Sequence, residues 1–289
     1  MPGDSESFTP ERAYAPWEIK PAFDFGRVMS RTFSGLFRNI VPVLIAGLLI
    51  SLLSGVTLLA TSMITDTGPD DTYLSGVVGL MTTLYLIFLG CLYYGFCMDV
   101  AYRTLIGYPV GLKDSMWRAL PHAFPLMVIA FLFWTGFFLG YLALLVPALI
   151  LTAGWAIPGP AYMFGGAPIL GSFGESWRLT RGYKWWVWLI NFVVGLIAQI
   201  GAISLFILIF MVLALFQQTD LTTDPEAELS QAEAAFTFTA TLLCFNLLAG
   251  LYASMKAAIY SECVDLQDMW ERNRVGLSNA ENDDPPVVI

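Results

Sequence analysis

The chain has 289 residues, of which 57% are hydrophobic and only 13% are charged. A soluble core of this length cannot bury so much apolar surface, so the composition excludes an ordinary soluble protein and predicts an integral membrane protein. The formal net charge of -9 argues against nucleic acid as a partner, because a nucleic-acid interface needs clustered surplus Lys and Arg side chains.

The first 22 residues are polar and contain several prolines. They include no apolar stretch that could serve as a secretory signal, so we expect a disordered segment over residues 1–22 and no cleaved leader. Residues 266–289 end in an acidic, Pro-interrupted sequence, which predicts a largely disordered cytoplasmic tail. The membrane domain is therefore expected over residues 23–265.

Four stretches are apolar enough to cross a bilayer, whose hydrocarbon core of about 30 Å needs about 20 helical residues. They are residues 40–63, 76–98, 184–216 and 234–260. We assign these stretches to spans one, two, five and six of an all-α, polytopic fold with six transmembrane helices.

The third and fourth spans are expected between Ala123 and Pro168, a segment with no charged side chain. As one continuous helix it would be about 69 Å long, more than twice the hydrocarbon thickness, so it must fold back. Pro147 fits the first turn of a second helix, whereas Pro158 and Pro160 should kink or break that helix. The fourth span should therefore be short and irregular.

The distribution of charge supports six spans, because Lys and Arg accumulate in short cytoplasmic loops. All 14 basic residues fall on one side of a six-span chain, while loops 64–75 and 217–233 carry only acidic charges. Both termini are then cytoplasmic, in the inner membrane if the cell has two. The interfacial anchors expected on this side are Arg27, Arg31, Arg38, Arg178, Arg181, Lys184, Trp185 and Trp186.

A short basic, amphipathic segment precedes each odd-numbered span, and the three segments align at offsets of 83 and 61 residues. The alignment places Thr32, Ser115 and Ser176 level with one another. A genuine threefold repeat and a chance likeness among basic loops both explain it. Such segments should form interfacial helices and attract anionic lipids. Simple anchoring is the plainer role, and lipid sensing is the alternative.

Several of these sequences resemble the glycerophosphoryl diester phosphodiesterase membrane-domain family. The likeness rests on FDFGRVMSRTFSGLFRN before span one, LLVPALIL between spans three and four, ESWRLTRGYKWW before span five and LYASMKAAIYSE in span six. The resemblance implies a six-span module that is sometimes fused to a soluble phosphodiesterase domain and often stands alone without established activity. TAGWAIPGPAYMFGGAP departs from the family, because an acidic residue is expected shortly after span four.

The chain lacks the residues for a hydrolytic site. Its one histidine, His122, cannot supply the acid–base pair and metal-binding carboxylates that the fused phosphodiesterases need. His122 is interpreted as an interfacial side chain, with a proton relay as the alternative. The four cysteines show no metal-binding spacing and indicate free thiols. We therefore expect a protein that is not an enzyme, with no cofactor and no metal.

Ionisable and polar residues within the spans are the remaining candidates for a site, because such residues are costly in lipid. Asp99 and Lys256 are placed at similar depth and could pair between spans two and six. Alternatively, Asp99 pairs with Arg103 one turn on, while Lys256 extends to the surface. A polar seam is expected along Asn191 and Gln199 of span five and Asn246 of span six, where it would hold helices together or line a groove.

The sequence thus favours a non-enzymatic scaffolding or regulatory module of the cell envelope. Its expected partners are membrane lipids, especially anionic ones, and another membrane protein. The alternative is a transporter or lipid-handling protein, with a path beside the broken fourth span and the polar face of span five.

Overall fold

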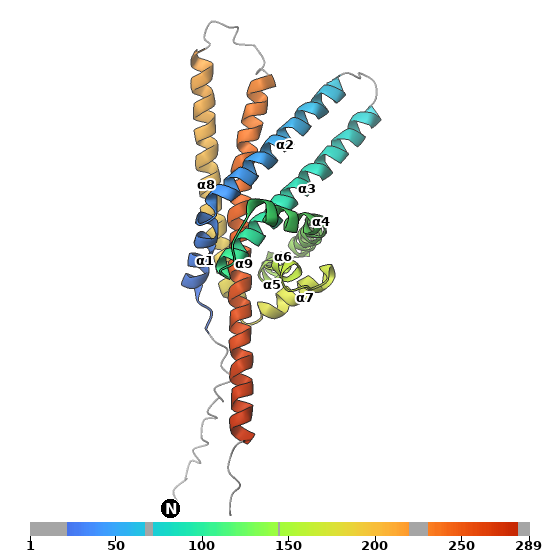
Figure 1. The fold of residues 1–289 in the computed structure, drawn as a ribbon. Helices are drawn as coiled ribbons and strands as arrows, with labels where there is room; N and C mark the ends of the chain where they lie inside the picture. The colour runs from blue at the N-terminus through green and yellow to red at the C-terminus, as the bar shows by residue number, and fades with distance from the viewer. Residues whose placement is uncertain (1–21, 67–71, 144, 220–230, 283–289) are drawn as a thin grey trace, which may run out of the picture.

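The computed structural model describes residues 22–66, 72–143, 145–219 and 231–282. This part of the chain contains helices and no strands (Figure 1). The helices are α1 (Phe25–Phe37), α2 (Ile40–Asp66), α3 (Thr72–Leu105), α4 (Leu112–Ala143), α5 (Leu145–Gly154), α6 (Pro158–Met163), α7 (Ile169–Leu179), α8 (Lys184–Thr219) and α9 (Gln231–Asn282).

Five of these helices are long and apolar enough to cross a membrane: α2, α3, α4, α8 and α9. The all-helical, membrane-type fold predicted from composition is therefore present. The predicted fourth span corresponds to α5, which has only 10 residues and so covers about 15 Å. Six membrane crossings are not established by these helices.

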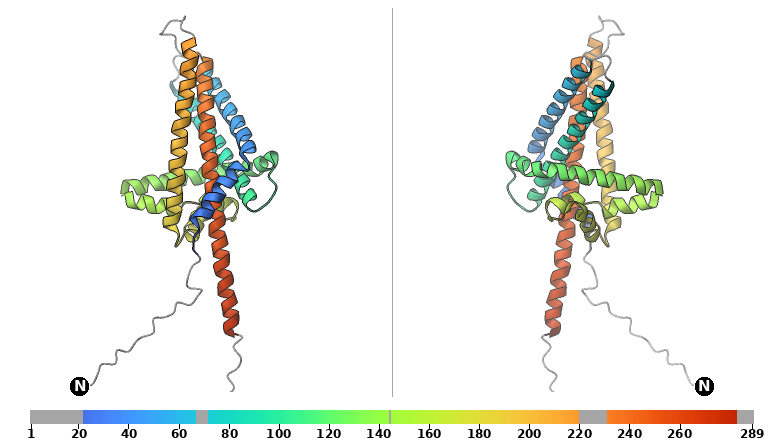
Figure 2. Two further views of the ribbon diagram at one scale, coloured as in Figure 1. Left: turned by 90° about the vertical axis from the view of Figure 1, so that its left-hand side faces the viewer. Right: turned by 90° about the vertical axis from the view of Figure 1, so that its right-hand side faces the viewer.

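The long helices form hairpins with different directions. In both views of Figure 2, the α4–α5 hairpin runs across the direction of α8 and α9. The α2–α3 hairpin leans away from α8 and α9 toward its tip (Figure 1). We call the end at which α2 begins and α3 ends the basal end. There α9 is central, because it packs against α1, α2, α3, α6, α7 and α8.

The core lies at this basal end, where α3 and α9 cross. Tyr93, Phe96 and Met98 of α3 and Met255 and Ile259 of α9 are fully buried. The Tyr93 hydroxyl donates a hydrogen bond to the Val43 carbonyl of α2 (3.3 Å), which ties a third helix to the crossing. Beyond the crossing, α2, α3 and α8 expose most of their large apolar side chains, as expected where lipid replaces water as the solvent.

The uncharged stretch folds back as predicted, although the turn comes slightly earlier. The chain reverses between α4 and α5, and Pro147 lies in the first turn of α5. Pro158 begins α6, a helix of 6 residues, so the expected break is also present. Pro121 and Pro125 stay inside α4 without ending it.

The carboxyl-terminal region differs from the sequence-based expectation. We predicted a largely disordered tail over residues 266–289, but α9 continues to Asn282. The prediction was wrong for residues 266–282, because the residues after Tyr260 are polar yet keep good helix formers and contain no proline before Pro285. The disorder expected over residues 1–22 concerns a segment of which the structure describes only residue 22.

The three amphipathic segments form different helices, but each contains a buried hydroxyl side chain. The first forms α1, the second forms the opening turns of α4, and the third is divided between the end of α7 and the start of α8. Thr32, Ser115 and Ser176, which the sequence alignment placed level with one another, are all fully buried. The threefold repeat stays a prediction, with this shared burial in its favour.

Candidate functional site

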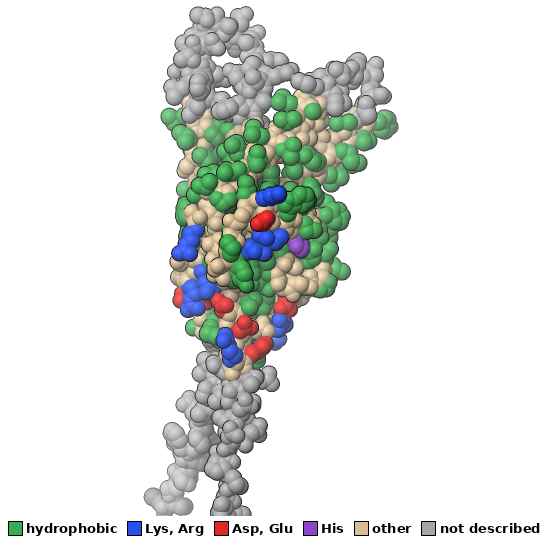
Figure 3. Space-filling view, in the orientation of Figure 1, with side chains coloured by type: hydrophobic (Ala, Val, Ile, Leu, Met, Phe, Trp, Pro, Cys, Tyr) green, Lys and Arg blue, Asp and Glu red, His purple; other side chains and the backbone are tan. Residues whose placement is uncertain are grey.

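Charged side chains gather at the basal end of the described surface, and apolar side chains cover the region above them (Figure 3). We call this set of ionisable residues the charged layer. Seven of its members make up two separate ion clusters: Arg27, Arg31, Glu262 and Asp265 between α1 and α9, and Asp99, Arg103 and Arg118 between α3 and α4.

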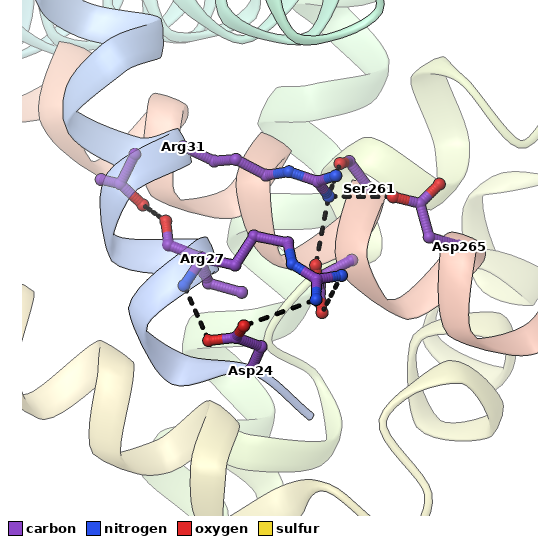
Figure 4. A network of polar contacts seen from close by, with 8 residues as sticks. Asp24, Arg27, Arg31, Ser261 and Asp265 are labelled. Atoms are coloured by element: carbon purple, nitrogen blue, oxygen red, sulfur yellow. Dashed lines mark hydrogen bonds and ion pairs between the residues drawn. The ribbon is translucent and has the colours of Figure 1, made fainter. Parts of the chain in front are cut away.

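The first cluster joins α1 to α9 (Figure 4). Nη1 of Arg31 lies 2.8 Å from the Ser261 hydroxyl, 3.2 Å from Oε2 of Glu262 and 2.9 Å from Oδ2 of Asp265. Arg27 lies 3.4 Å from the other oxygen of Glu262. Because the Glu262 side chain is wholly buried, its charge is tolerable only beside these two arginines.

Asp24 fixes the start of α1 in this cluster. Its carboxylate accepts a hydrogen bond from the backbone N–H of Arg27 (2.9 Å), which is an N-cap. That bond, together with the nearby guanidinium of Arg27, holds the pKa of Asp24 below its ordinary value. The cap therefore sets where α1 begins and where Arg27 and Arg31 emerge from it.

The second cluster centres on Asp99, whose side chain is only 6% exposed. Its Oδ1 accepts a hydrogen bond from Nε of Arg103 (3.2 Å), one turn along α3. Its Oδ2 accepts from Nε and Nη2 of Arg118 on α4 (3.3 Å each). The Asp99–Arg103 pair, one of the two alternatives drawn from the sequence, is therefore present.

The predicted Asp99–Lys256 pair was wrong. Lys256 instead donates a hydrogen bond to the Asn191 side chain of α8. Equal depth along two helices does not fix the direction in which each side chain points. Asp99 faces α4 and Lys256 faces α8, so α9 and α3 meet through apolar side chains rather than through this pair. The alternative in which Lys256 extends to the surface is also not what the structure shows.

The predicted polar seam divides between two helix contacts. Asn191 meets Lys256 across the α8–α9 contact, whereas Asn246 donates hydrogen bonds to the Ser51 hydroxyl (2.9 Å) and the Gly47 carbonyl (3.3 Å) of α2. Gln199 lies exposed on α8. The three residues therefore do not line a common groove, and the two amides join α9 to different neighbours.

The anchors predicted around the start of α8 occupy the outside of the layer. Arg178 pairs with Glu175 one turn earlier (2.6 Å), and this hydrogen bond raises the pKa of the guanidinium. The Lys184 ammonium lies 3.1 Å from the ring centroid of Trp177, a cation–π contact. Trp185 is 82% exposed and Trp186 is 46% exposed. Arg38 and Arg181 are also exposed.

Sequence reasoning missed one structural role at the broken span. The Ser176 hydroxyl of α7 donates to the Gly154 carbonyl at the end of α5 (2.9 Å) and accepts from the Ile157 N–H before α6 (3.1 Å). It therefore satisfies backbone groups that the break leaves without helical partners. The signal was the alignment of Ser176 with Thr32 and Ser115, which placed a hydroxyl on each segment but did not give its partner.

His122 lies in α4 with its ring edge-on to Tyr162 (5.4 Å between centroids). Its buried Nδ1 has no hydrogen-bond partner among the described residues. The residue is half-buried, and no ionisable side chain of the described part is joined to it by an ion pair. This setting agrees better with an interfacial histidine than with a member of a proton relay.

Comparisons with protein-family models, with curated proteins and with solved structures give no match. The resemblance to the glycerophosphoryl diester phosphodiesterase membrane-domain family therefore stays a prediction. In the described residues, ion pairs and amides join helices to one another, while other cations and tryptophans at the basal end are exposed.

Proposed function

We propose that the chain is a polytopic membrane protein in which α2, α3, α8 and α9 cross the bilayer with both termini in the cytoplasm, in the inner membrane where there are two. In this proposal the charged layer lies at the cytoplasmic surface. The proposal is supported by the exposed apolar side chains of α2, α3 and α8 and by the gathering of basic residues at the basal end.

In this proposal the α4–α5 hairpin lies along the cytoplasmic surface of the membrane, because it runs across the direction of α8 and α9 near the basal end (Figure 2). Its exposed side chains are apolar along most of its length, including Phe131, Trp134, Phe138, Leu142 and Val146. A hairpin at the surface and a hairpin with two full crossings both place the flanking basic loops on the same side, so the positive-inside pattern fits either arrangement. In the six-span arrangement the hairpin would instead run alongside α8 and α9 and cross fully, with α1 and α7 as interfacial helices.

Within the membrane, the chain acts as a non-enzymatic scaffolding or regulatory module. The observation that carries this function is the use of the polar groups in the apolar helices. Asp99, Asn191, Asn246 and Lys256 all bond to neighbouring helices, which stabilises a packed bundle. The exposed cations and aromatic side chains of the basal end are then the surface available to lipids and to a protein partner.

A transport function is less well supported. The proposed path ran beside Pro158 and Gln199, yet Pro158 and Gly159 are buried against neighbouring side chains. A methyl group placed at Gly159 would lie in ordinary van der Waals contact with Met98 and Leu126, so side chains of α3 and α4 fill the space beside α6. Gln199 is on the exposed face of α8. These residues therefore act in packing and on the outer surface rather than along a shared channel.

The sidedness can be tested by labelling single cysteines with a membrane-impermeant maleimide. Lys113→Cys and Gly174→Cys replace exposed residues of the basal end, and a cysteine in loop 217–233 serves as the opposite control. In intact cells we expect labelling of the loop alone, with the two basal positions reacting only after lysis. Labelling of either basal position from outside would refute the proposed orientation.

The scaffolding function can be tested by extracting the full chain in native lipid and identifying co-isolated proteins by mass spectrometry. We expect a specific protein partner that is lost when Arg38 and Lys113, two exposed cations, are both replaced by Gln. Arg272→Gln is the matched control, because Arg272 is exposed but lies beyond the layer on α9. Recovery of one specific lipid or solute without any protein would instead favour the transport or lipid-handling alternative.

A further inference from the structure

Two arginines of the charged layer share a single buried carboxylate where α3 meets α4. Asp99 lies beneath the surface, while the side chains of Arg103 and Arg118 are 29% and 37% exposed. Because two guanidinium groups face one carboxylate, the cluster retains one uncompensated positive charge. That charge lies where the pair reaches the surface, so the cluster can attract an anion.

The orientation of the two guanidinium groups leaves hydrogen-bond donors free. Asp99 holds Arg103 through Nε, and it holds Arg118 through Nε and Nη2. Nη2 of Arg118 also donates to the Ser115 hydroxyl (3.2 Å). The two terminal nitrogens of Arg103 and Nη1 of Arg118 donate to no described side chain. We call Asp99 a brace, because it holds both guanidinium groups in place while their remaining nitrogens stay free to donate.

The hydrogen bonds that the two arginines donate to Asp99 are also longer than typical charge-assisted hydrogen bonds. They measure 3.2–3.3 Å, whereas charge-assisted N–H to carboxylate bonds are typically about 2.7–2.9 Å. An arginine fork matches two oxygens of a phosphate group in a bidentate arrangement that a lysine ammonium cannot make, and the two terminal nitrogens of Arg103 are free to do so while Nη1 of Arg118 is free to donate a further hydrogen bond. The free donors therefore suit a tetrahedral oxyanion.

The surroundings of the cluster favour a lipid as the source of that phosphate. Tyr108 and Trp117 expose 61% and 64% of their surface, and Phe124 exposes 60%, all close in sequence to the two arginines. Exposed aromatic rings beside a cationic group are typical of the level of lipid headgroups. Asp114, the acidic residue in the first turn of α4, forms no ion pair with Arg118 in the described part. It therefore occupies none of the donors of Arg118.

We propose that Arg103 and Arg118 bind the phosphate group of an anionic lipid headgroup, and that Asp99 positions them for it. Asp99 itself does not contact the ligand. The site rests on the proposed membrane placement, because only then do Trp117 and Phe124 lie beside acyl chains. A free phosphate ion has the same chemistry, so the test must separate the two sources.

The test measures lipid binding to the purified, delipidated full chain by native mass spectrometry in detergent. Phosphatidylglycerol is the anionic probe, phosphatidylcholine is the zwitterionic one and inorganic phosphate is the competitor. We expect phosphatidylglycerol to bind more tightly than phosphatidylcholine, and not to be displaced by inorganic phosphate at equal concentration. Displacement would overturn the assignment to a lipid and indicate a free phosphate as the ligand.

Paired replacement of Arg103 and Arg118 by Lys keeps both charges over Asp99 but removes both forks. We expect it to weaken phosphatidylglycerol binding about tenfold, because bidentate charge-assisted hydrogen bonds are lost. Arg178→Gln is the control, since it removes a charge from the same layer whose guanidinium is already held by Glu175. Equal binding by the wild-type chain and the double Lys variant would overturn the site.

Asp99→Asn separates positioning from charge. This change makes the cluster more positive, so simple attraction predicts tighter phosphatidylglycerol binding, whereas loss of the brace predicts weaker binding. We expect the weaker binding, and the tighter result would refute the role of Asp99. In each case the variant must remain in the membrane fraction with unchanged cysteine labelling. A failure of the binding site is thereby distinguished from a failure of the proposed membrane placement.

Discussion

Arg31→Gln should destabilise the protein much more than Glu262→Gln, although both changes remove one member of the same ion pair. Without Arg31, the wholly buried Glu262 keeps only Arg27, whose contact is 3.4 Å long. Without the charge of Glu262, by contrast, Arg31 keeps Asp265 at 2.9 Å and the Ser261 hydroxyl at 2.8 Å. The two substitutions therefore leave very different buried groups unsatisfied.

The magnitude depends on the burial of the two partners. Leaving a buried charge without its partner costs about 3–5 kcal/mol, and the remaining contact with Arg27 and the partial exposure of Arg31 reduce this to about 2–3 kcal/mol. Glu262→Gln keeps a polar side chain of the same shape and should cost at most about 1 kcal/mol. The double variant should resemble Glu262→Gln rather than the sum of the two, because the residues are coupled.

The assay is reversible unfolding of the full chain in mixed micelles, followed by tryptophan fluorescence, with thermal unfolding as a second measure. Arg31→Gln should lower the melting temperature by roughly 5–10 °C. Arg178→Gln serves as a control, because the Arg178–Glu175 pair is on the surface and should contribute less than about 1 kcal/mol. If Arg31→Gln and Glu262→Gln cost the same, or if their effects add, Glu262 does not depend on Arg31 as argued.

Three further changes test the contacts between helices by the same assay. Asn191→Val removes the acceptor of Lys256 and should lower the free energy of unfolding by about 1–3 kcal/mol. Adding Lys256→Met should recover most of that loss, and no recovery would contradict the pairing. Asn246→Leu removes the hydrogen bonds to α2 and should cost about 0.5–1.5 kcal/mol, whereas an unchanged stability would show that these bonds contribute nothing. Gly154→Ala places a methyl group against the Trp177 ring and should lower the free energy of unfolding by about 1–3 kcal/mol. Gly174→Ala is the control, because its methyl group meets open space and should leave the stability unchanged. Equal effects of the two variants would refute the close packing.

The helices were predictable from sequence because long apolar runs leave few alternatives. Residues 40–63 and 184–216 became the greater part of α2 and α8, which begin at the predicted residues Ile40 and Lys184. The basal ends were less predictable. The second span was predicted to end at residue 98, but α3 continues to Leu105. Asp99 and Arg103 lie one turn apart and neutralise each other, and a hydropathy scale does not take such a pair into account.

The partners on other helices could not be deduced, because they depend on the rotation of each helix about its axis. Asp99 and Lys256 were singled out as polar residues in apolar helices and Arg103 was named as one possible partner of Asp99, but Arg118 and Asn191 are their partners on neighbouring helices. The orientation of the α4–α5 hairpin could not be predicted from the sequence either. An uncharged stretch shows that a segment avoids water, but it does not show the angle at which it leaves its neighbours.

The contact between α1 and α9 also constrains how the protein is made. Arg31 precedes Asp265 by 234 positions in the chain, so Arg31 has no acidic partner until the last helix has been made. At a synthesis rate of about 5–20 residues per second, this wait is roughly 10–50 s. During that interval α1 is a cationic, amphipathic helix without its acidic partners on α9, free to lie on the membrane or to be bound by a chaperone. Closure of the bundle by α9 would then mark the end of assembly, and a chain that stops before Glu262 would never reach it.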